Sequence, residues 1–235
     1  MTKKNLVLAF SSFFISRDPD RGRLEEYAIC YEQLHRVLPD TFSLIFVDNT
    51  IANKRDLAMI SQRLYKAVDN TPCLFYDNNI GVSNKGLGEL DMLAKAFNRL
   101  DLSSYDKISY LTGRRFVTCP YVFYRTENCK KKILVGSQHF VNAQSGQVIP
   151  LTPNCFEDMY FSMDYDVMVE YVDYAKKNMN PPSGVGSEQI LYSFVNSTKY
   201  EYEELNHLGF IRNNWERWGS TPNQYTRDLQ NYMVC

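Results

Sequence analysis

The segment FSLIFVDN, residues 42–49, is a short run of apolar residues that ends in polar ones. A continuous apolar run of this length is typical of a strand buried on both faces, as strands are in a parallel sheet. Similar runs are LVLAFSSFF (6–14), CLFYDNN (73–79) and KISYL (107–111). The sequence therefore predicts four buried strands.

The segments between these strands have the periodicity of helices. Apolar residues recur at helical spacing over 24–38, 57–68 and 87–100. Strands that alternate with helices form a parallel sheet with helices on both faces. We therefore expect an α/β fold built on a Rossmann-type, mostly parallel sheet.

The second half of the chain has a different pattern. Residues 131–151 are predicted to form an antiparallel hairpin, and helical spacing over 168–175 predicts a helix. A further helix is expected over 184–195, with Ser187 as its N-cap. The tail from Tyr200 is aromatic, and we expect it to be irregular, either a lid or a surface wrap.

Composition and charge limit the classes of function. The chain has 235 residues, of which 44% are hydrophobic, so it can build a full core. Its net charge of −1 gives no overall attraction to nucleic acid or to an anionic membrane. We therefore expect no nucleic-acid partner, and any anion site must be built locally.

The cysteines and the N-terminus bear on the compartment. The six cysteines are scattered without a CxxC pair, which argues against zinc and predicts reduced thiols in a cytoplasmic protein. The first 16 residues, MTKKNLVLAFSSFFIS, mimic a signal peptide but lack a cleavage site, so a first strand is the better interpretation. No segment is apolar enough to predict an integral membrane helix.

The predicted strands end in polar clusters. In parallel sheets, ligands bind beyond the carboxyl ends of the strands, so these clusters are expected to meet in one crevice. They are Ser11 and Ser12, Asp48 and Asn49, Asp77 to Asn79, and Thr112 to Arg115.

Two of these clusters have a specific ligand chemistry. Asp48 can accept hydrogen bonds from a base or ribose, although a turn or N-cap aspartate is the stronger interpretation of that residue alone. Arg114 and Arg115 present donors that match phosphate oxygens, so they can neutralise a diphosphate. The alternative is that one arginine pairs with a buried carboxylate and the other is solvated.

The segment NNIGVSNKGLGELDML, residues 78–93, has the features of a phosphate-binding helix start. Asn84, Lys85, Gly86 and Gly88 lie before or within the first turn of the predicted helix. Free N–H groups at a helix start favour phosphate, and the lysine adds a positive charge. Neither a Walker loop nor a GxGxxG fingerprint is present. The alternative is a capped loop in which the glycines supply flexibility.

Glu188 is the candidate base. It is expected in the first turn of the helix over 184–195, where a carboxylate can deprotonate an acceptor hydroxyl if it faces the crevice. The alternative is that it only stabilises the helix dipole.

The order of VDN, DNN, NKGLGELD and KISYLTGRR resembles the nucleotide-sugar domain of GT-A glycosyltransferases. NKGxGE and TGRR look like elements of small bacterial and large-DNA-virus (chlorovirus-like) enzymes that build glycans. The resemblance covers roughly residues 5–195. It implies one GT-A-like domain, with a nucleotide-sugar half at 1–118, an acceptor half at 119–198 and a tail or lid at 199–235.

The resemblance also implies a reaction and its site. The donor would be a nucleoside diphosphate sugar and the acceptor a hydroxyl of a glycan or glycoprotein, in the cytoplasm (the host's, if the protein is viral). Glu188 would be the base of an inverting reaction. The residues implied in donor binding are Ser11, Asp48, Asn49, Asn84, Lys85 and Gly86.

Metal dependence is where this sequence departs from the family. Many GT-A enzymes carry an Asp-x-Asp metal motif at the end of the fourth strand, but here that place reads LTGRR. We therefore expect no metal cofactor, with Arg114 and Arg115 stabilising the leaving diphosphate instead. A literal Asp-x-Asp, Asp164 and Asp166, comes later, ahead of a helix, and is an alternative site for Mg or Mn.

Two other functions stay open. A nucleotidyltransferase that makes sugar nucleotides would need a glycine-rich basic loop after the first strand, and SSFFISRDPDRGR supplies arginines but only Gly22. The third candidate is a non-catalytic module that binds nucleotides or glycans.

Overall fold

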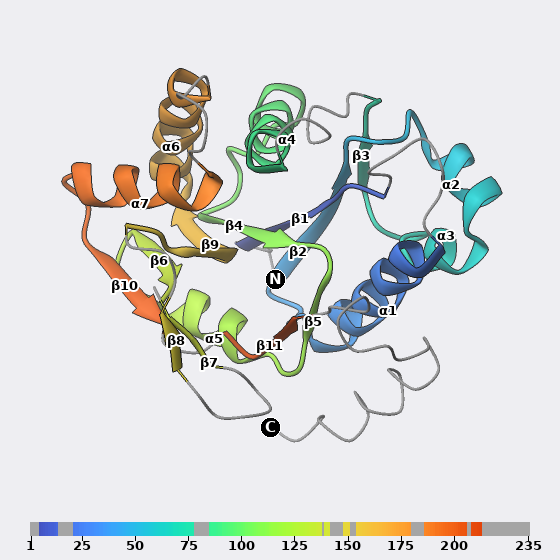
Figure 1. Ribbon diagram of the computed structural model, residues 1–235, viewed down its shortest axis with the longest axis horizontal. Coiled ribbons are helices and arrows are strands. Elements are labelled where there is room, and N and C mark those ends of the chain that lie inside the picture. Colours follow the sequence, from blue (N-terminus) through green and yellow to red (C-terminus); the bar gives the residue numbers. More distant parts are fainter. Residues whose placement is uncertain are drawn as a thin grey trace.

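The computed structural model describes residues 5–13, 21–77, 85–137, 139–141, 148–150, 154–179, 186–205 and 208–212. In this part of the chain, a seven-stranded sheet has the order β10-β6-β9-β4-β1-β2-β3 (Figure 1). The four predicted strands lie side by side at one end of it and run parallel. They are β1 (Asn5–Ser11), β2 (Phe42–Asp48), β3 (Cys73–Phe75) and β4 (Lys107–Thr112). The mostly parallel sheet is therefore confirmed.

The rest of the sheet differs from the prediction in two ways. Strand β9 (Glu157–Asp164), which was not predicted, is antiparallel to both β4 and β6. The hairpin predicted over 131–151 is wrong in its first half, because β6 (Ile133–Gly136) joins the main sheet. The separate hairpin is β7 (His139–Val141) with β8 (Val148–Pro150).

The tail was predicted to be irregular, and this is wrong for its described part. Strand β10 (Tyr202–Leu205) extends the main sheet beside β6, and β11 (Phe210–Arg212) pairs with β5 (Arg115–Val117). These segments become strands because they pair with segments that are distant in the sequence. Their mixed polarity does not by itself predict a strand.

Helices cover both faces of the sheet (Figure 1). One core cluster includes residues of α4, α6 and α7, and the other includes residues of α1, α3 and α5. The helices are α1 (Arg21–Val37), α2 (Lys54–Ile60), α3 (Gln62–Ala67), α4 (Lys85–Arg99), α5 (Tyr121–Asn128), α6 (Tyr165–Asn178) and α7 (Ser187–Ser197).

Two predicted helix boundaries are wrong. The segment 57–68 is not one helix, because Ser61 ends α2 and its side chain accepts a hydrogen bond from Leu64 N at the start of α3. Ser187 is the first residue of α7 rather than its cap. The N-cap is Gly186, whose N–H donates to the side chain of Gln189.

The two faces explain the continuous apolar runs. Along β1, Leu6, Leu8 and Phe10 belong to the core under α4 and α6, whereas Val7 and Ala9 belong to the core under α1. A buried Leu or Phe side chain stabilises the fold by roughly 1.5–3 kcal/mol, so a strand covered on both faces gains from every residue. Such a strand has no polar face.

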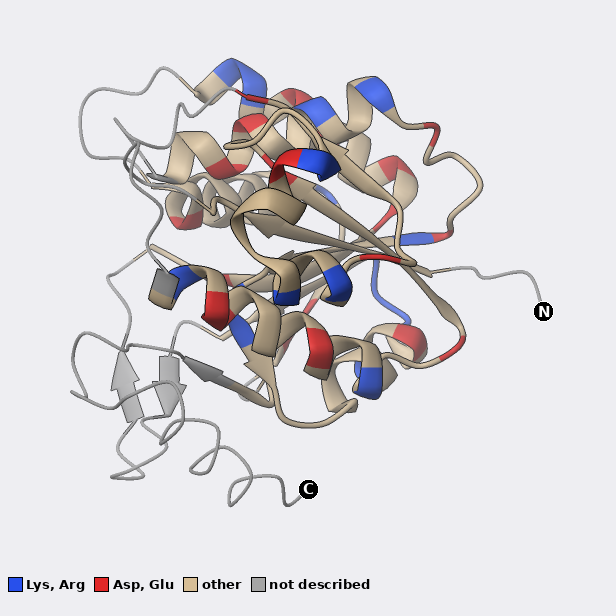
Figure 2. Cartoon of the chain, turned by 90° about the vertical axis from the view of Figure 1, so that its right-hand side faces the viewer, with Lys and Arg blue, Asp and Glu red and all other residues tan. Residues whose placement is uncertain are grey.

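The surface of the protein carries charges of both signs (Figure 2). Acidic and basic residues are interspersed over the helices in view (Figure 2). None of the five cysteines among the described residues forms a disulfide. Within the same residues, no helix is both long enough and apolar enough to cross a membrane.

Candidate functional site

The carboxyl ends of the parallel strands meet at one edge of the sheet, which we call the carboxyl edge. In the register of β1 and β2, Ser11 pairs with Asp48, and in that of β1 and β4, Phe10 pairs with Thr112. The polar strand ends of the first, second and fourth strands therefore lie side by side, as expected. Of the third cluster, Asp77 is described and 78–79 lie outside the described residues.

Asp48 organises this edge from inside. It is fully buried, and its Oδ2 accepts from the backbone N–H of Phe13, while Oδ1 accepts from the N–H and hydroxyl of Thr50. Burial raises the pKa of the Asp48 carboxyl to about 6, while the hydrogen bonds from Thr50 and Phe13 oppose that rise. This is the geometry of a turn aspartate, and its contact with a nucleoside stays a prediction.

The side chain of Asn49 has an unused hydrogen-bond donor. Its Oδ1 accepts from the hydroxyl of Ser12 at 2.8 Å, and its Nδ2 has no hydrogen-bond partner among the described residues. The side chain is fully buried, and an unpaired buried amide donor is costly. Ser11, in contrast, donates to the carbonyl of Val47. Asn49 thus retains a donor at this edge.

The predicted phosphate loop is described in part. Asn84 lies outside the described residues, while Lys85 and Gly86 open α4. Helix α4 is the first element described after β3, so its N-terminus lies toward the carboxyl edge (Figure 1). That position agrees with the predicted role, which stays a prediction.

The two arginines after β4 have different surroundings. Arg114 Nη1 donates to Glu26 Oε2 of α1 at 3.2 Å, which is the pairing with a buried carboxylate that the sequence left as an alternative. Arg115 lies in β5 and is 8% exposed, so it is not solvated. A guanidinium has five donors, and the contact between Arg114 and Glu26 uses one of them. The role at a diphosphate stays a prediction.

Acidic side chains gather around the hydroxyl of Ser187. Its Oγ lies 2.7 Å from Asp158 Oδ2, 3.2 Å from Glu89 Oε2 and 3.4 Å from Glu188 Oε2. We call these four residues the Ser187 cluster. Ser187, Asp158 and Glu89 are each 6% exposed, whereas Glu188 is partly exposed.

The register places this cluster at the carboxyl edge. Tyr160 of β9 pairs with Leu111 of β4, and β9 is antiparallel, so Asp158 lies beyond the end of β4. Helix α4 contributes Glu89 from its second turn, and α7 contributes Glu188 from its first. The predicted base therefore shares an edge with Asn49, across the strand order β9-β4-β1-β2.

Sequence reasoning missed Glu89 and Asp158 as site residues. Glu89 stands inside the quoted motif NKGLGELD, where only the basic and small residues were considered. Asp158 had no visible signal, because it becomes a strand-end residue only when β9 is known to pair with β4.

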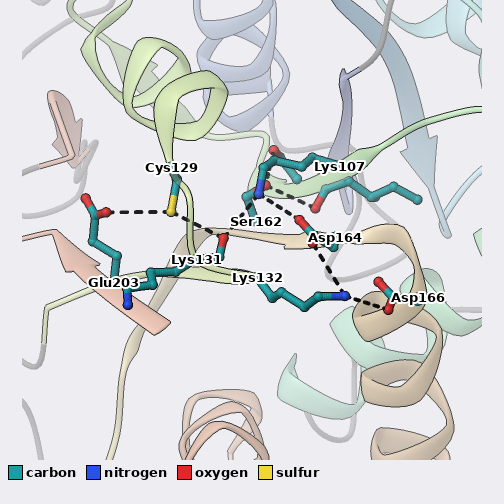
Figure 3. Close-up of polar contacts among 10 residues, drawn as sticks. Lys107, Cys129, Lys131, Lys132, Ser162, Asp164, Asp166 and Glu203 are labelled. Carbon is teal, nitrogen blue, oxygen red and sulfur yellow. Dashed lines mark hydrogen bonds and ion pairs between the residues drawn. The ribbon is translucent and has the colours of Figure 1, made fainter. Parts of the chain in front are cut away.

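The literal Asp-x-Asp lies at the opposite edge of the sheet. Asp164 pairs in register with Lys107 at the start of β4, and the two side chains form an ion pair (Figure 3). Lys132 contacts both Asp164 and Asp166, with its Nζ 2.8 Å from Asp166. As expected, both acids stand at the start of the following helix, α6.

The described residues contain no group of three His, Cys, Asp or Glu side chains that can hold a metal ion. The carboxylates of the Ser187 cluster and of the Asp-x-Asp therefore do not by themselves form a complete site for a metal ion.

Comparisons with known proteins identify the fold. No protein-family model matches the sequence, and no curated protein matches it. The structure is similar to that of 4-diphosphocytidyl-2C-methyl-D-erythritol synthase from Anaerococcus prevotii DSM 20548, with a TM-score of 0.58 and 14% identity over 96% of each chain. It is also similar to the inositol-1-phosphate CTP transferase from T. maritima, with a TM-score of 0.55 and 14% identity over 99% of this chain and 98% of that one.

A third similar structure comes from Desulfovibrio desulfuricans G20 and is described as a nucleotide-diphospho-sugar transferase. Its TM-score is 0.54, with 8% identity over 97% of this chain and 96% of that one. The chain thus has the mixed α/β fold of nucleotide-diphospho-sugar transferases. At identities of 14% or less, the likeness establishes the fold and leaves the reaction open.

Proposed function

We propose that the protein is a glycosyltransferase, which moves a sugar from a nucleoside diphosphate sugar to a hydroxyl of a glycan or glycoprotein acceptor. The observation that carries this proposal is the position of Glu188. Its carboxylate is partly exposed, stands at the N-terminus of α7, and lies at the same edge of the sheet as Asn49. An acceptor hydroxyl approaching that edge meets a base, which a module that only binds nucleotides does not need.

The roles follow the strand order. Asn49 would bind the nucleoside at the ends of β2 and β1, and the hydroxyl of Ser12, which donates to Asn49, would hold that side chain in place. Lys85, Gly86 and Arg114 would bind the diphosphate. The spacing of strands puts Asp158 and Asn49, three strands apart, about 14 Å from each other, which leaves room for an extended donor between them.

In this proposal Glu188 takes the proton of the acceptor hydroxyl as the oxygen attacks the anomeric carbon of the sugar. The bond from that carbon to the diphosphate oxygen breaks, and the nucleoside diphosphate leaves with the electron pair. A positive group near that oxygen stabilises the developing charge, and Arg114 is the described residue proposed for this task. The reaction inverts the configuration at the anomeric carbon.

A second candidate function is nucleotidyl transfer. It is favoured by Arg23, whose Nε donates to the carbonyl of Ser12 at the end of β1, near Arg114 and Glu26 on the same face of the sheet. Two guanidinium groups beside β1 suit a nucleoside triphosphate. Two of the similar structures are named as a CTP transferase and a diphosphocytidyl synthase, which agrees with this candidate.

One set of assays separates these functions. The protein is incubated with UDP-, GDP-, dTDP- and CDP-sugars and, separately, with the nucleoside triphosphates and sugar 1-phosphates. Release of nucleoside diphosphate from the sugar nucleotides supports glycosyl transfer, and release of pyrophosphate from the triphosphates supports nucleotidyl transfer. Tight binding with neither release identifies a binding module, and no binding of any nucleotide contradicts both enzymatic candidates.

A further inference from the structure

The Ser187 cluster holds more acidic groups than a single catalytic base requires. Ser187 has one hydroxyl proton, so it can donate to only one of the three carboxylates that contact its oxygen. Asp158 is the nearest of them, at 2.7 Å. An ionised carboxylate offers about four sites that accept hydrogen bonds. The carboxylates of the cluster therefore have many more acceptor sites than the one hydroxyl donor of Ser187 can fill.

A buried tyrosine adds an independent observation. Tyr110 of β4 is 3% exposed, and its hydroxyl has no hydrogen-bond partner among the described residues. Burial raises the pKa of Tyr110 well above its ordinary value, and Glu89 and Asp158 raise it further, so the phenol lies within electrostatic reach of the cluster. The Thr112 side chain is near enough to lower that pKa but does not reach hydrogen-bond geometry.

The ring of Tyr110 is fixed in place. It stacks on Phe10 at 4.6 Å between ring centroids and on Phe161 at 4.8 Å. These contacts fix the position of the phenol oxygen, because a stacked ring cannot move it toward another partner. A buried hydroxyl without a partner is costly, so a ligand that hydrogen-bonds to it recovers that cost.

The chemistry of the site defines the ligand. Carboxylates accept hydrogen bonds, and a phenol both donates and accepts, which matches the hydroxyl groups of a sugar ring. A sugar that carries its own carboxylate would bring a further negative charge against Asp158, at a buried position where like charges repel more strongly than in water. The cluster should therefore accept neutral sugars and reject uronic acids.

We propose that Asp158, Ser187 and Tyr110 line the subsite for the sugar ring of the donor, and that this subsite selects neutral sugars against uronic acids. The inference rests on the proposed glycosyl transfer. It assigns Asp158 as a specificity residue, distinct from the base Glu188.

The first test needs no variant. Release of nucleoside diphosphate is measured for three matched donor pairs: UDP-glucose and UDP-glucuronate, GDP-mannose and GDP-mannuronate, and dTDP-glucose and dTDP-glucuronate. For the base that the protein accepts, kcat/KM for the neutral donor should exceed that for the uronate by a factor of about ten or more. Equal use of both members of that pair overturns the inference and leaves glycosyl transfer standing. If no donor of any kind is hydrolysed or transferred, the proposed function fails, and the inference fails with it.

The second test uses one variant and a matched control. Asp158→Asn keeps the shape and removes the charge, so the preference for the neutral donor should fall by about tenfold. Asp173→Asn removes an exposed aspartate on α6 and should leave the preference unchanged. If Asp158→Asn folds normally, as judged by circular dichroism and thermal unfolding, and retains the wild-type preference, the inference is wrong.

Tyr110→Phe tests the same subsite without changing any charge. The ring and its stacking are kept, and only a buried hydroxyl without a described partner is lost, so the free energy of unfolding should not fall. KM for the neutral donor should rise by about threefold to tenfold. An unchanged KM contradicts the contact. Each assay is repeated with Mn²⁺ and with a chelator. If Mn²⁺ stimulates the wild-type activity and no longer does so in Asp158→Asn, the cluster is a metal site and the sugar subsite is overturned.

Discussion

Arg114 joins the loop after β4 to helix α1, because its Nη1 donates to Oε2 of Glu26 at 3.2 Å. The Glu26 side chain is 2% exposed and that of Arg114 is 30% exposed, so the acid is buried and the base is partly accessible. A buried carboxylate needs such a partner. Loss of Arg114 alone would therefore destabilise the fold, whatever else Arg114 does.

Arg114→Ala should lower both stability and transfer. Loss of the arginine leaves the Glu26 carboxylate buried without this partner, and we expect the free energy of unfolding to fall by about 1–3 kcal/mol. If Arg114 also contacts the diphosphate, kcat should fall by about a hundredfold. Urea denaturation and initial rates with saturating donor measure the two effects.

A double variant separates the two roles. In Glu26→Gln with Arg114→Ala, the buried charge is gone, so most of the lost stability should return. Transfer should stay low, because the guanidinium is still missing. If the rate recovers together with the stability, Arg114 acts only on the fold.

Asp48 should make stability depend on pH. Burial raises the pKa of its carboxyl from 3.8 to about 6, so the folded state binds the proton more tightly than the unfolded state. The corresponding stabilisation is fully present below the unfolded pKa and is lost as the pH rises through about 6. A shift of about two units corresponds to roughly 3 kcal/mol.

Unfolding free energies of wild type and Asp48→Asn, measured between about pH 4 and about pH 8, test this. The variant has no carboxyl group that titrates at this position. The difference in the free energy of unfolding between the two proteins should therefore change from about pH 4 to about pH 6 and be constant above that. The variant should also be less stable overall, because its amide N–H₂ cannot accept from Phe13 or Thr50. A constant difference for Asp48→Asn would refute the raised pKa.

Gly113 should tolerate no side chain. A Cβ there would lie 2.5 Å from Tyr31 Oη and 2.7 Å from the carbonyl oxygen of Phe10. We expect Gly113→Ala to lower the free energy of unfolding by about 1–3 kcal/mol. In a Tyr31→Phe background the hydroxyl is absent, so the penalty should become smaller but not vanish, since the Phe10 contact is to backbone. Equal penalties in both backgrounds would mean that Tyr31 is not the obstacle.

Asn49→Ala should weaken nucleotide binding. Its Nδ2 has no partner among the described residues, and one hydrogen bond to a base or ribose corresponds to about a tenfold change in Kd. Isothermal titration with the nucleoside diphosphate that the protein prefers measures the change.

Asn53→Ala is the matched control. Asn53 lies four residues further on and caps α2, accepting from the N–H groups of Arg55 and Asp56. Its loss should lower stability by about 1 kcal/mol and leave the Kd unchanged. Equal loss of affinity in both variants would remove Asn49 from the site.

The first half of the fold could be read from local patterns. Strands β1 to β4 are buried on both faces, so their apolar runs stand out, and the helices between them have a clear apolar stripe. The second half could not be read in this way. Strand β9 has acids near both ends, and β5 and β11 are only three residues long, so their partners, not their composition, make them strands.

The candidate site was predictable to a similar extent. Asn49 and Glu188 follow local signals, the end of a strand and the start of a helix. The partner of Arg114 is Glu26, 88 positions away, and Asp158 and Glu89 meet at Ser187 from separate elements. No local pattern indicates such meetings.

The sequence by itself determined the mostly parallel sheet and the edge at which a ligand would bind, because hydrophobic periodicity and the polar ends of strands are local properties of the chain. The tertiary structure decided which charges meet. It turned Arg114 toward Glu26, separated Asp164 and Asp166 from the carboxyl edge, and gathered carboxylates around Ser187. Strand order and helix packing bring together charged residues that are far apart in the sequence, so a local pattern cannot predict which of them form pairs.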